Sequence, residues 1–85
     1  MPEISRFFGI IICMFANEHA PSHFHAYYQD FEISVEIETG IVEGRFPPKQ
    51  LRSVLDWCEL HREELIKNWN IAVEHGKLSK IAPLK

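Results

Sequence analysis

The strictest pattern along the chain is the alternation of apolar and polar residues over 31 to 38, FEISVEIE. Such alternation predicts a β-strand with one buried face and one wet face. Residues 23 to 28, HFHAYY, alternate less strictly, and Phe24, Ala26 and Tyr28 are the expected inner set. Both segments therefore predict strands of a sheet that is covered on one side.

A two-residue turn at Gln29 and Asp30 would join these two strands as a hairpin. Two-residue turns are the commonest hairpin connections. The polar pairs then expected on the outer face are His23 with Glu36, His25 with Ser34, and Tyr27 with Glu32. A slip of one residue would put the apolar side chains on the wrong face, so the inner pattern supports this register.

Residues 40 to 46, GIVEGRF, predict a further, shorter strand that follows a turn at Thr39 and Gly40. The pairs expected across this turn are Ile37 with Val42, Glu36 with Glu43, and Ser34 with Arg45. Two like charges that face each other destabilise a sheet. The paired glutamates therefore suggest a site where Arg45, a protonated His23 or a bound cation neutralises them.

Residues 6 to 15 form an apolar run with three consecutive isoleucines. A run this short predicts one strand, covered on both faces or in the middle of the sheet. Its length also suits the apolar part of a signal peptide, but little positive charge precedes it. It is too short to cross a bilayer, which takes about 20 residues. We therefore expect a core strand and a soluble, cytoplasmic protein that does not enter the membrane.

The C-terminal half predicts one long amphipathic helix over about 48 to 75. Apolar residues recur there at three- and four-residue steps, so one stripe faces the sheet. Pro47 and Pro48 suit the helix start, because proline has no donor to lose in a first turn. Gly76 is a natural stop at the other end.

These elements predict a single α+β domain over residues 1 to 85. A small antiparallel sheet of three to four strands, within residues 4 to 46, would pack against one long C-terminal helix. The helix is long for so small a domain, and a bend near residues 61 to 64 would fit its length. The tail, 77 to 85, is expected to pack its apolar residues onto the sheet or onto a partner.

Length and composition agree with a small globular protein. The 85 residues are 46% hydrophobic and 25% charged, which separates the chain from disordered sequences. The net charge of -3 gives no overall attraction to nucleic acid, so such binding would need a local basic patch. Cys13 and Cys58 fall in apolar patterns, and we expect both to be buried, reduced thiols.

Three histidines close together, His19, His23 and His25, are the strongest candidates for chemistry. Imidazole, with a carboxylate such as Glu36, suits zinc or another divalent metal. The spacing matches no metal-binding motif of high specificity. The alternative is a solvated strand face on which histidines and glutamates share hydrogen bonds.

The same face offers candidates for acid–base catalysis, namely His23, His25, Glu36 and Arg45. Histidine catalysis needs a base, a partner that orients it and a group that stabilises developing charge, as in metal-free RNA cleavage. No residue is marked as a nucleophile. Whether the chain is an enzyme therefore stays open at this point.

Two residues of the predicted helix have competing interpretations. Trp57 lies out of phase with the apolar stripe, so it either anchors a protein partner or packs sideways against the tail. His61 lies near the stripe. We expect it to be a hydrogen-bonded histidine at the edge of the core rather than a metal ligand.

Four segments resemble, in order, the pattern of the prokaryotic domain of unknown function family 4160: MPEISRFFGIIICMF, NEHAPSHFHAYY, WCELHREELIKNW and KIAPL. The pattern falls on Arg6, Gly9, His19, Pro21, His23, His25, Trp57, His61, Glu64, Leu65, Asn68 and Trp69. Cys13 takes a place that often holds an aromatic residue or another hydrophobe. The resemblance implies a short, stand-alone cytoplasmic protein without an established activity.

Members of that family often occur beside another small family, domain of unknown function 2442, in an arrangement similar to a two-gene toxin–antitoxin pair. The resemblance therefore implies a protein-binding module with a small partner encoded nearby; self-association into a homo-oligomer is a further expectation. A metal-binding or RNA-cleaving protein that uses the histidine face is the alternative. A nucleic-acid-binding repressor component is a third interpretation, which the acidic balance disfavours.

Overall fold

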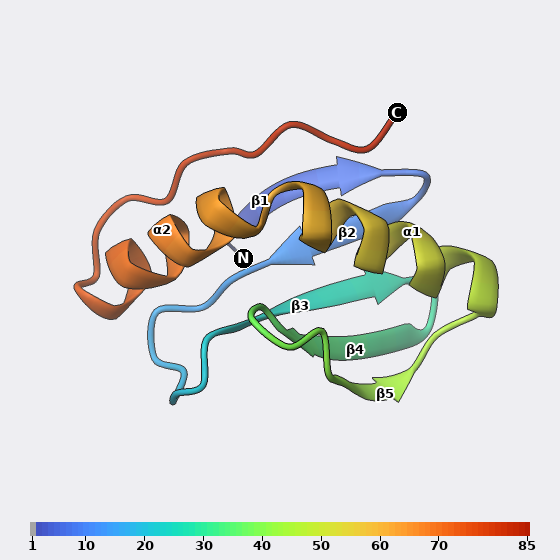
Figure 1. Cartoon of the computed structure of the whole chain (residues 1–85), viewed down its shortest axis with the longest axis horizontal. Coiled ribbons are helices and arrows are strands. Elements are labelled where there is room, and N and C mark those ends of the chain that lie inside the picture. Colours follow the sequence, from blue (N-terminus) through green and yellow to red (C-terminus); the bar gives the residue numbers. More distant parts are fainter. Residues whose placement is uncertain (1) are drawn as a thin grey trace.

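The computed structural model describes residues 2–85 and contains five strands followed by two helices. The strands are β1 (Glu3–Phe7), β2 (Ile10–Cys13), β3 (His23–Tyr28), β4 (Phe31–Glu36) and β5 (Val42–Arg45), and the helices are α1 (Pro48–Leu60) and α2 (Arg62–Val73). The strands form one antiparallel sheet in chain order (Figure 1). The α+β class is confirmed, but three to four strands and one long helix are too few.

The first apolar run is a hairpin rather than one strand. Phe8 and Gly9, with φ of 51° and 78°, turn the chain between β1 and β2. Glycine adopts positive φ without strain, whereas Phe8 does so at the tip of the turn, where the residue is 57% exposed. The prediction of a single strand over residues 6 to 15 is wrong, because an apolar residue in the turn leaves no break in hydropathy.

The hairpin of β3 and β4 has the predicted register throughout. Its pairs are His23 with Glu36, Phe24 with Val35, His25 with Ser34, Ala26 with Ile33, Tyr27 with Glu32, and Tyr28 with Phe31. The alternation of both strands fixes this register, since a slip of one residue would expose the whole inner set. The turn lies at Gln29 and Asp30, and Gln29 has a positive φ of 52°.

The register of β4 and β5 differs from the prediction by two residues. Ser34 faces Glu43, and Glu32 faces Arg45. The connection is longer than a two-residue turn, because the N–H of Glu36 donates to the carbonyl of Ile41 at 2.9 Å. A shift of two residues keeps each side chain on its face but removes the expected pairing of Glu36 with Glu43.

The helical half divides at His61, whose φ of -115° and ψ of 25° lie outside the helical region. The break falls in the region where a bend was expected, and it makes two helices of the predicted one. After α2, His75 has a positive φ of 59°, and the N–H of Gly76 donates to the carbonyl of Ile71 at 2.9 Å. Within residues 2–85, neither helix is long and apolar enough to cross a membrane.

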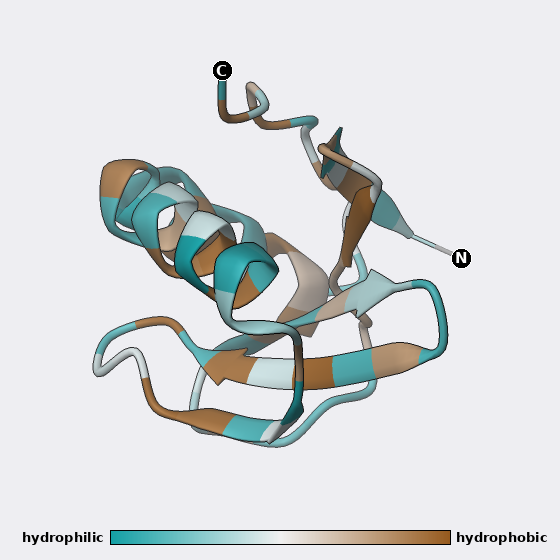
Figure 2. Cartoon of the chain, turned by 90° about the vertical axis from the view of Figure 1, so that its right-hand side faces the viewer, coloured by the Kyte–Doolittle hydropathy of each residue, from teal (hydrophilic) through white to brown (hydrophobic). Residues whose placement is uncertain are grey.

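The core lies between one face of the sheet and the two helices, and the chain end crosses back toward β1 (Figures 1 and 2). The N–H of Ile81 donates to the carbonyl of Ile4 at 2.8 Å. The side chain of Asn68, buried on α2, exchanges two hydrogen bonds with the backbone of Ser79, at 2.8 and 3.1 Å. The tail therefore packs on the sheet and on α2, and Ile81 is buried.

Trp57 lies at the centre of this core with 0% of its surface exposed. The rings of Phe7 and Phe24 lie 5.4 and 5.6 Å from its ring, and its indole N–H donates to the carbonyl of Ala82 at 2.8 Å. The expectation that Trp57 is an exposed anchor for a partner is wrong. Packing against the tail is confirmed, because the returning chain covers this side of α1.

Both cysteines are free and buried, as predicted. Burial raises the pKa of the Cys58 thiol, and burial together with the negative charge of Glu3 raises the pKa of the Cys13 thiol. Both thiols are therefore neutral at neutral pH and act as small apolar side chains.

Candidate metal centre

His23 and His25 belong to the outer face of the sheet, and His23, the first residue of β3, is also reached by Trp69 of α2. Phe24, between them, is fully buried on the inner side. The side chains of His23 and His25 are only 18% and 17% exposed. Trp69 packs against the ring of His23 at 5.2 Å, and Phe15 packs against that of His25 at 5.1 Å. The expectation of imidazoles on a wet face is therefore wrong in part: the face is as predicted, but the rings are half-buried.

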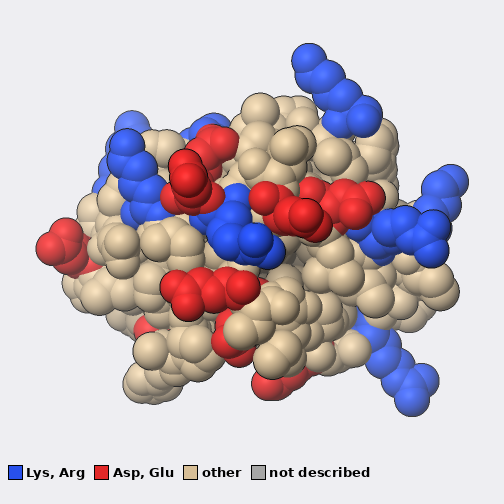
Figure 3. All heavy atoms as spheres, viewed as in Figure 1, with Lys and Arg blue, Asp and Glu red and all other residues tan. Residues whose placement is uncertain are grey.

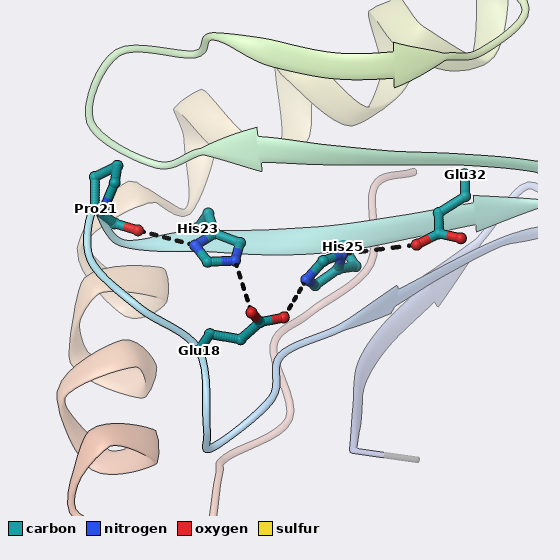
Figure 4. A network of polar contacts seen from close by, with 5 residues as sticks. All are labelled: Glu18, Pro21, His23, His25 and Glu32. Carbon is teal, nitrogen blue, oxygen red and sulfur yellow. Dashed lines mark hydrogen bonds and ion pairs between the residues drawn. The ribbon is translucent and has the colours of Figure 1, made fainter.

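Glu18, in the loop between β2 and β3, turns its carboxylate between the two rings (Figure 4). Its Oε1 lies 2.6 Å from Nε2 of His25, and its Oε2 lies 3.6 Å from Nε2 of His23. One ligand atom from each of the three residues lies within 4.8 Å of the others, which makes this the one such group within residues 2–85. Glu18 was missed in the sequence; its signal is an acid directly before His19 in the same loop.

The structure places the other predicted site residues around this group but not in it. His19 is exposed and lines a pocket of about 210 Å³ together with His23 and Glu36. The carboxylate near Nε2 of His23 is that of Glu18, at 3.6 Å, rather than that of Glu36. Arg45 is exposed on β5 and is not among the residues that line this pocket. Of the four catalytic candidates, the pocket therefore brings together His23 and Glu36.

The donor geometry of His23 suits a metal ligand. Its Nδ1 lies 2.9 Å from the carbonyl oxygen of Pro21. A carbonyl oxygen only accepts, so Nδ1 carries the hydrogen and Nε2 of the neutral ring has a free lone pair that faces Glu18. Metal-bound histidines usually donate their other ring N–H to a carbonyl or a carboxylate in this way.

The spacing of the ligand atoms is close to that of a loaded site. Zinc bonds of about 2.0–2.1 Å place tetrahedral ligand atoms about 3.3 Å apart. Oε2 of Glu18 lies 3.6 Å from Nε2 of His23 and Oε1 lies 2.6 Å from Nε2 of His25, on either side of that value. Small movements of three side chains would therefore bring two imidazole nitrogens and a carboxylate oxygen to one ion.

The surroundings of the group are acidic. Oε2 of Glu32 lies 3.9 Å from Nδ1 of His25. Burial, and then the negative charge of Glu32, raises the pKa of the neighbouring Tyr27. Glu36 and Glu43 line the adjoining pocket. These carboxylates favour a bound cation and repel an anion such as a phosphate backbone.

Basic side chains do not form a separate patch on the face of the molecule shown in Figure 3. On the face shown in Figure 3, lysine and arginine side chains lie among aspartate and glutamate side chains, over the helices. A nucleic-acid interface needs basic residues that are gathered on one face. The distribution on this face is that of an ordinary solvated surface.

His61 is a separate, structural histidine. Its Nδ1 lies 2.7 Å from Oε1 of Glu64, and its ring packs against that of Trp57 at 5.7 Å. The side chain is only 12% exposed. The prediction of a hydrogen-bonded histidine at the edge of the core is confirmed.

Fold and site together define a small α+β protein in which two imidazoles and a carboxylate gather on one face of an antiparallel sheet. The chain belongs to the family described as domain of unknown function (DUF4160), whose model matches residues 9–70. The matched part contains Glu18, β3 and most of the helical half, and it bears out the resemblance noted in the sequence. No curated protein and no solved structure matches the chain.

Proposed function

We propose that this protein binds a divalent transition-metal ion, zinc being the leading candidate, through Glu18, His23 and His25. The observation that carries the proposal is the convergence of three ligand atoms within 4.8 Å. Two imidazoles and one carboxylate match the ligand preference of zinc and of its first-row neighbours. Three protein ligands would leave at least one position on the ion for water or another ligand.

Zinc titration in competition with a chromogenic chelator tests the proposal. The wild-type chain should take up one equivalent, and a His23→Ala/His25→Ala variant should take up none. His19→Ala is the matched control, because His19 is also a histidine and lies next to Glu18 in the loop before β3, but is outside the ligand group. Circular dichroism must show that all three chains are folded. Equal uptake by the wild type and the double variant would end the proposal.

RNA cleavage by the same histidines is less well supported by the arrangement. A phosphodiester approaching His23 through the adjoining pocket would meet Glu36 and Glu43. Arg45, the cation expected to stabilise the phosphate, is not among the residues that line the pocket. The acidic lining would oppose both binding of the substrate and the charge that develops during cleavage.

We propose partner binding as a second candidate function, supported by the free edge of the sheet at β5. The tail lies along β1, whereas β5 is the last strand of the sheet in the described chain. Ile41, directly before β5, is 58% exposed. An unpaired edge strand can accept a strand from another protein through main-chain hydrogen bonds.

Co-expression with the product of the adjacent gene, followed by size-exclusion chromatography, tests this second candidate. A partner that uses the β5 edge should co-elute with the wild-type chain and less with Ile41→Glu. Elution of the chain alone at twice its mass would instead indicate a homo-oligomer. If the two products elute separately at micromolar concentration, the partner proposal loses its support.

A further inference from the structure

The two histidines differ at their second ring nitrogen. Nδ1 of His23 donates to the carbonyl of Pro21 at 2.9 Å. Nδ1 of His25 is shielded from solvent and has no hydrogen-bond partner among the described residues. The polar atom that faces it is Oε2 of Glu32, 3.9 Å away, beyond hydrogen-bond distance (Figure 4). The Nδ1 atom of His23 therefore has a hydrogen-bond partner, whereas the Nδ1 atom of His25 has none among the described residues.

Glu32 is held beside His25 by the register of the hairpin. It pairs with Tyr27 across β3 and β4, and His25 pairs with Ser34, so Glu32 lies diagonally across from His25 on the same face. Its side chain is 60% exposed and makes no hydrogen bond with another side chain among residues 2–85. A rotation that shortens the separation by about 1 Å would complete a hydrogen bond of ordinary length.

In the metal-free protein, the ring of His25 carries its hydrogen on the nitrogen that would have to bind the ion. Its Nε2 lies 2.6 Å from the Glu18 carboxylate, which only accepts when ionised, so Nε2 carries a hydrogen. Coordination through Nε2 requires a lone pair there. The neutral ring must then carry its hydrogen on Nδ1: one proton leaves Nε2 for water, and one from water arrives at Nδ1. The proton count of the ring does not change.

We propose that Glu32 is a positioning residue for this site: it accepts the hydrogen bond from Nδ1 of His25 when Nε2 of that ring coordinates the metal. The inference rests on the proposed metal binding. Glu32 then does for His25 what the Pro21 carbonyl does for His23, and it couples β4 to a site built from β3 and its loop. Outer-shell partners of this kind typically change metal affinity by about 10–100-fold.

Zinc affinities of the wild-type chain and of three variants test the inference. Glu32→Ala should weaken binding by about 10–100-fold. Glu32→Gln should weaken it less, because the amide oxygen still accepts a hydrogen bond. Glu43→Ala is the matched control: it removes the same charge from the same face and the same pocket, without a contact to either ring nitrogen of His25. Equal losses in Glu32→Ala and Glu43→Ala would overturn the inference and leave only a general charge effect.

Nitrogen-15 NMR of the zinc-loaded wild-type chain shows which ring nitrogen of His25 carries the hydrogen. A purely structural role of Glu32 would not affect this. The inference expects His25 to be coordinated through Nε2 with its hydrogen on Nδ1, and the Nδ1–H resonance to shift in Glu32→Gln. Coordination of His25 through Nδ1 would overturn it. If the wild-type chain binds no zinc, the proposed function itself fails; if it binds zinc and Glu32→Ala binds equally well, only the role of Glu32 fails.

Discussion

The two faces of β3 serve different purposes: one packs into the core and the other carries the candidate metal ligands. Phe24 and Ala26 are 0% exposed and pack into the core beneath the helices. His23 and His25, one residue away in each case, are half-buried on the other face beside a carboxylate. Because successive side chains of a strand point to opposite faces, one segment of six residues serves both the core and the site. The comparison teaches that substitutions on β3 should separate stability from metal binding.

The largest expected effect is on the inner face, with Phe24→Ala. The variant should lose about 3–5 kcal/mol of unfolding free energy, as truncation of a fully buried aromatic side chain leaves a cavity. In so short a chain, a loss of that size should leave a substantial unfolded fraction. Urea denaturation followed by circular dichroism measures it. A loss below about 1 kcal/mol would contradict the assignment of this face to the core.

The next effect concerns Gly44 on β5, which faces Ile33 of the inner set. A Cβ at Gly44 would lie 2.5 Å from the carbonyl oxygen of Glu32, and φ there is 107°. Gly44→Ala should therefore lower the unfolding free energy by about 1–3 kcal/mol. Gly40→Ala is the control, since Gly40 shares a positive φ but has open space around it. Equal losses in the two variants would show that the backbone angle, not the contact, decides.

Substitution on the outer face should have a smaller effect on the metal-free protein. His25→Ala removes one charged hydrogen bond to Glu18, which contributes about 1.5–3 kcal/mol at most and less where the group is partly exposed. Urea denaturation in the presence of a chelator measures this effect. With zinc at about 100 times its Kd, the wild-type chain should gain about 2.7 kcal/mol and His25→Ala should gain nothing. If zinc also raises the free energy of unfolding of His25→Ala, the metal does not bind through this face of β3.

The smallest effect is the pH dependence that the buried thiols introduce. Burial raises the pKa of Cys58 in the folded chain, so the unfolded chain releases this proton first as pH rises. The unfolded state then binds fewer protons, so the free energy of unfolding falls as pH rises above about 8.5, the ordinary pKa of a thiol. Below that pH the contribution of the buried Cys58 thiol to stability is fully present. Comparison of the wild-type chain with Cys58→Ala by urea denaturation at pH 7 and pH 9.5 measures it. An equal pH slope in both would contradict this cause.

Part of this fold follows from local pattern, and part depends on contacts that no pattern contains. Alternation in two adjacent segments determines the register of β3 and β4, because a slip would expose Phe24 and Val35. The hairpin of β1 and β2 could not be predicted in this way, since Phe8 is apolar yet lies in the turn. The register of β5 depends on the length of its turn, which ends at Ile41 and which composition does not reveal.

For the candidate site, likewise, only the two ligands on strand β3 could be predicted from the sequence. The period of two residues places His23 and His25 side by side. Glu18 replaces His19 as the third member of the group, because the loop before β3 places the Glu18 carboxylate beside both rings and leaves His19 exposed. The burial of Trp57 depends on the carbonyl of Ala82, far away in the sequence. Loop paths and tail contacts of this kind are set by tertiary packing rather than by local propensity.

The central claim is that Glu18, His23 and His25 hold one metal ion. Anomalous diffraction at the zinc edge, from crystals of the wild-type chain grown with zinc, tests it most directly. The account predicts a peak about 2.0–2.2 Å from Nε2 of His23, Nε2 of His25 and a carboxylate oxygen of Glu18. A peak in the pocket of His19 and Glu36 instead, or a zinc-loaded crystal with no peak on β3, would contradict it.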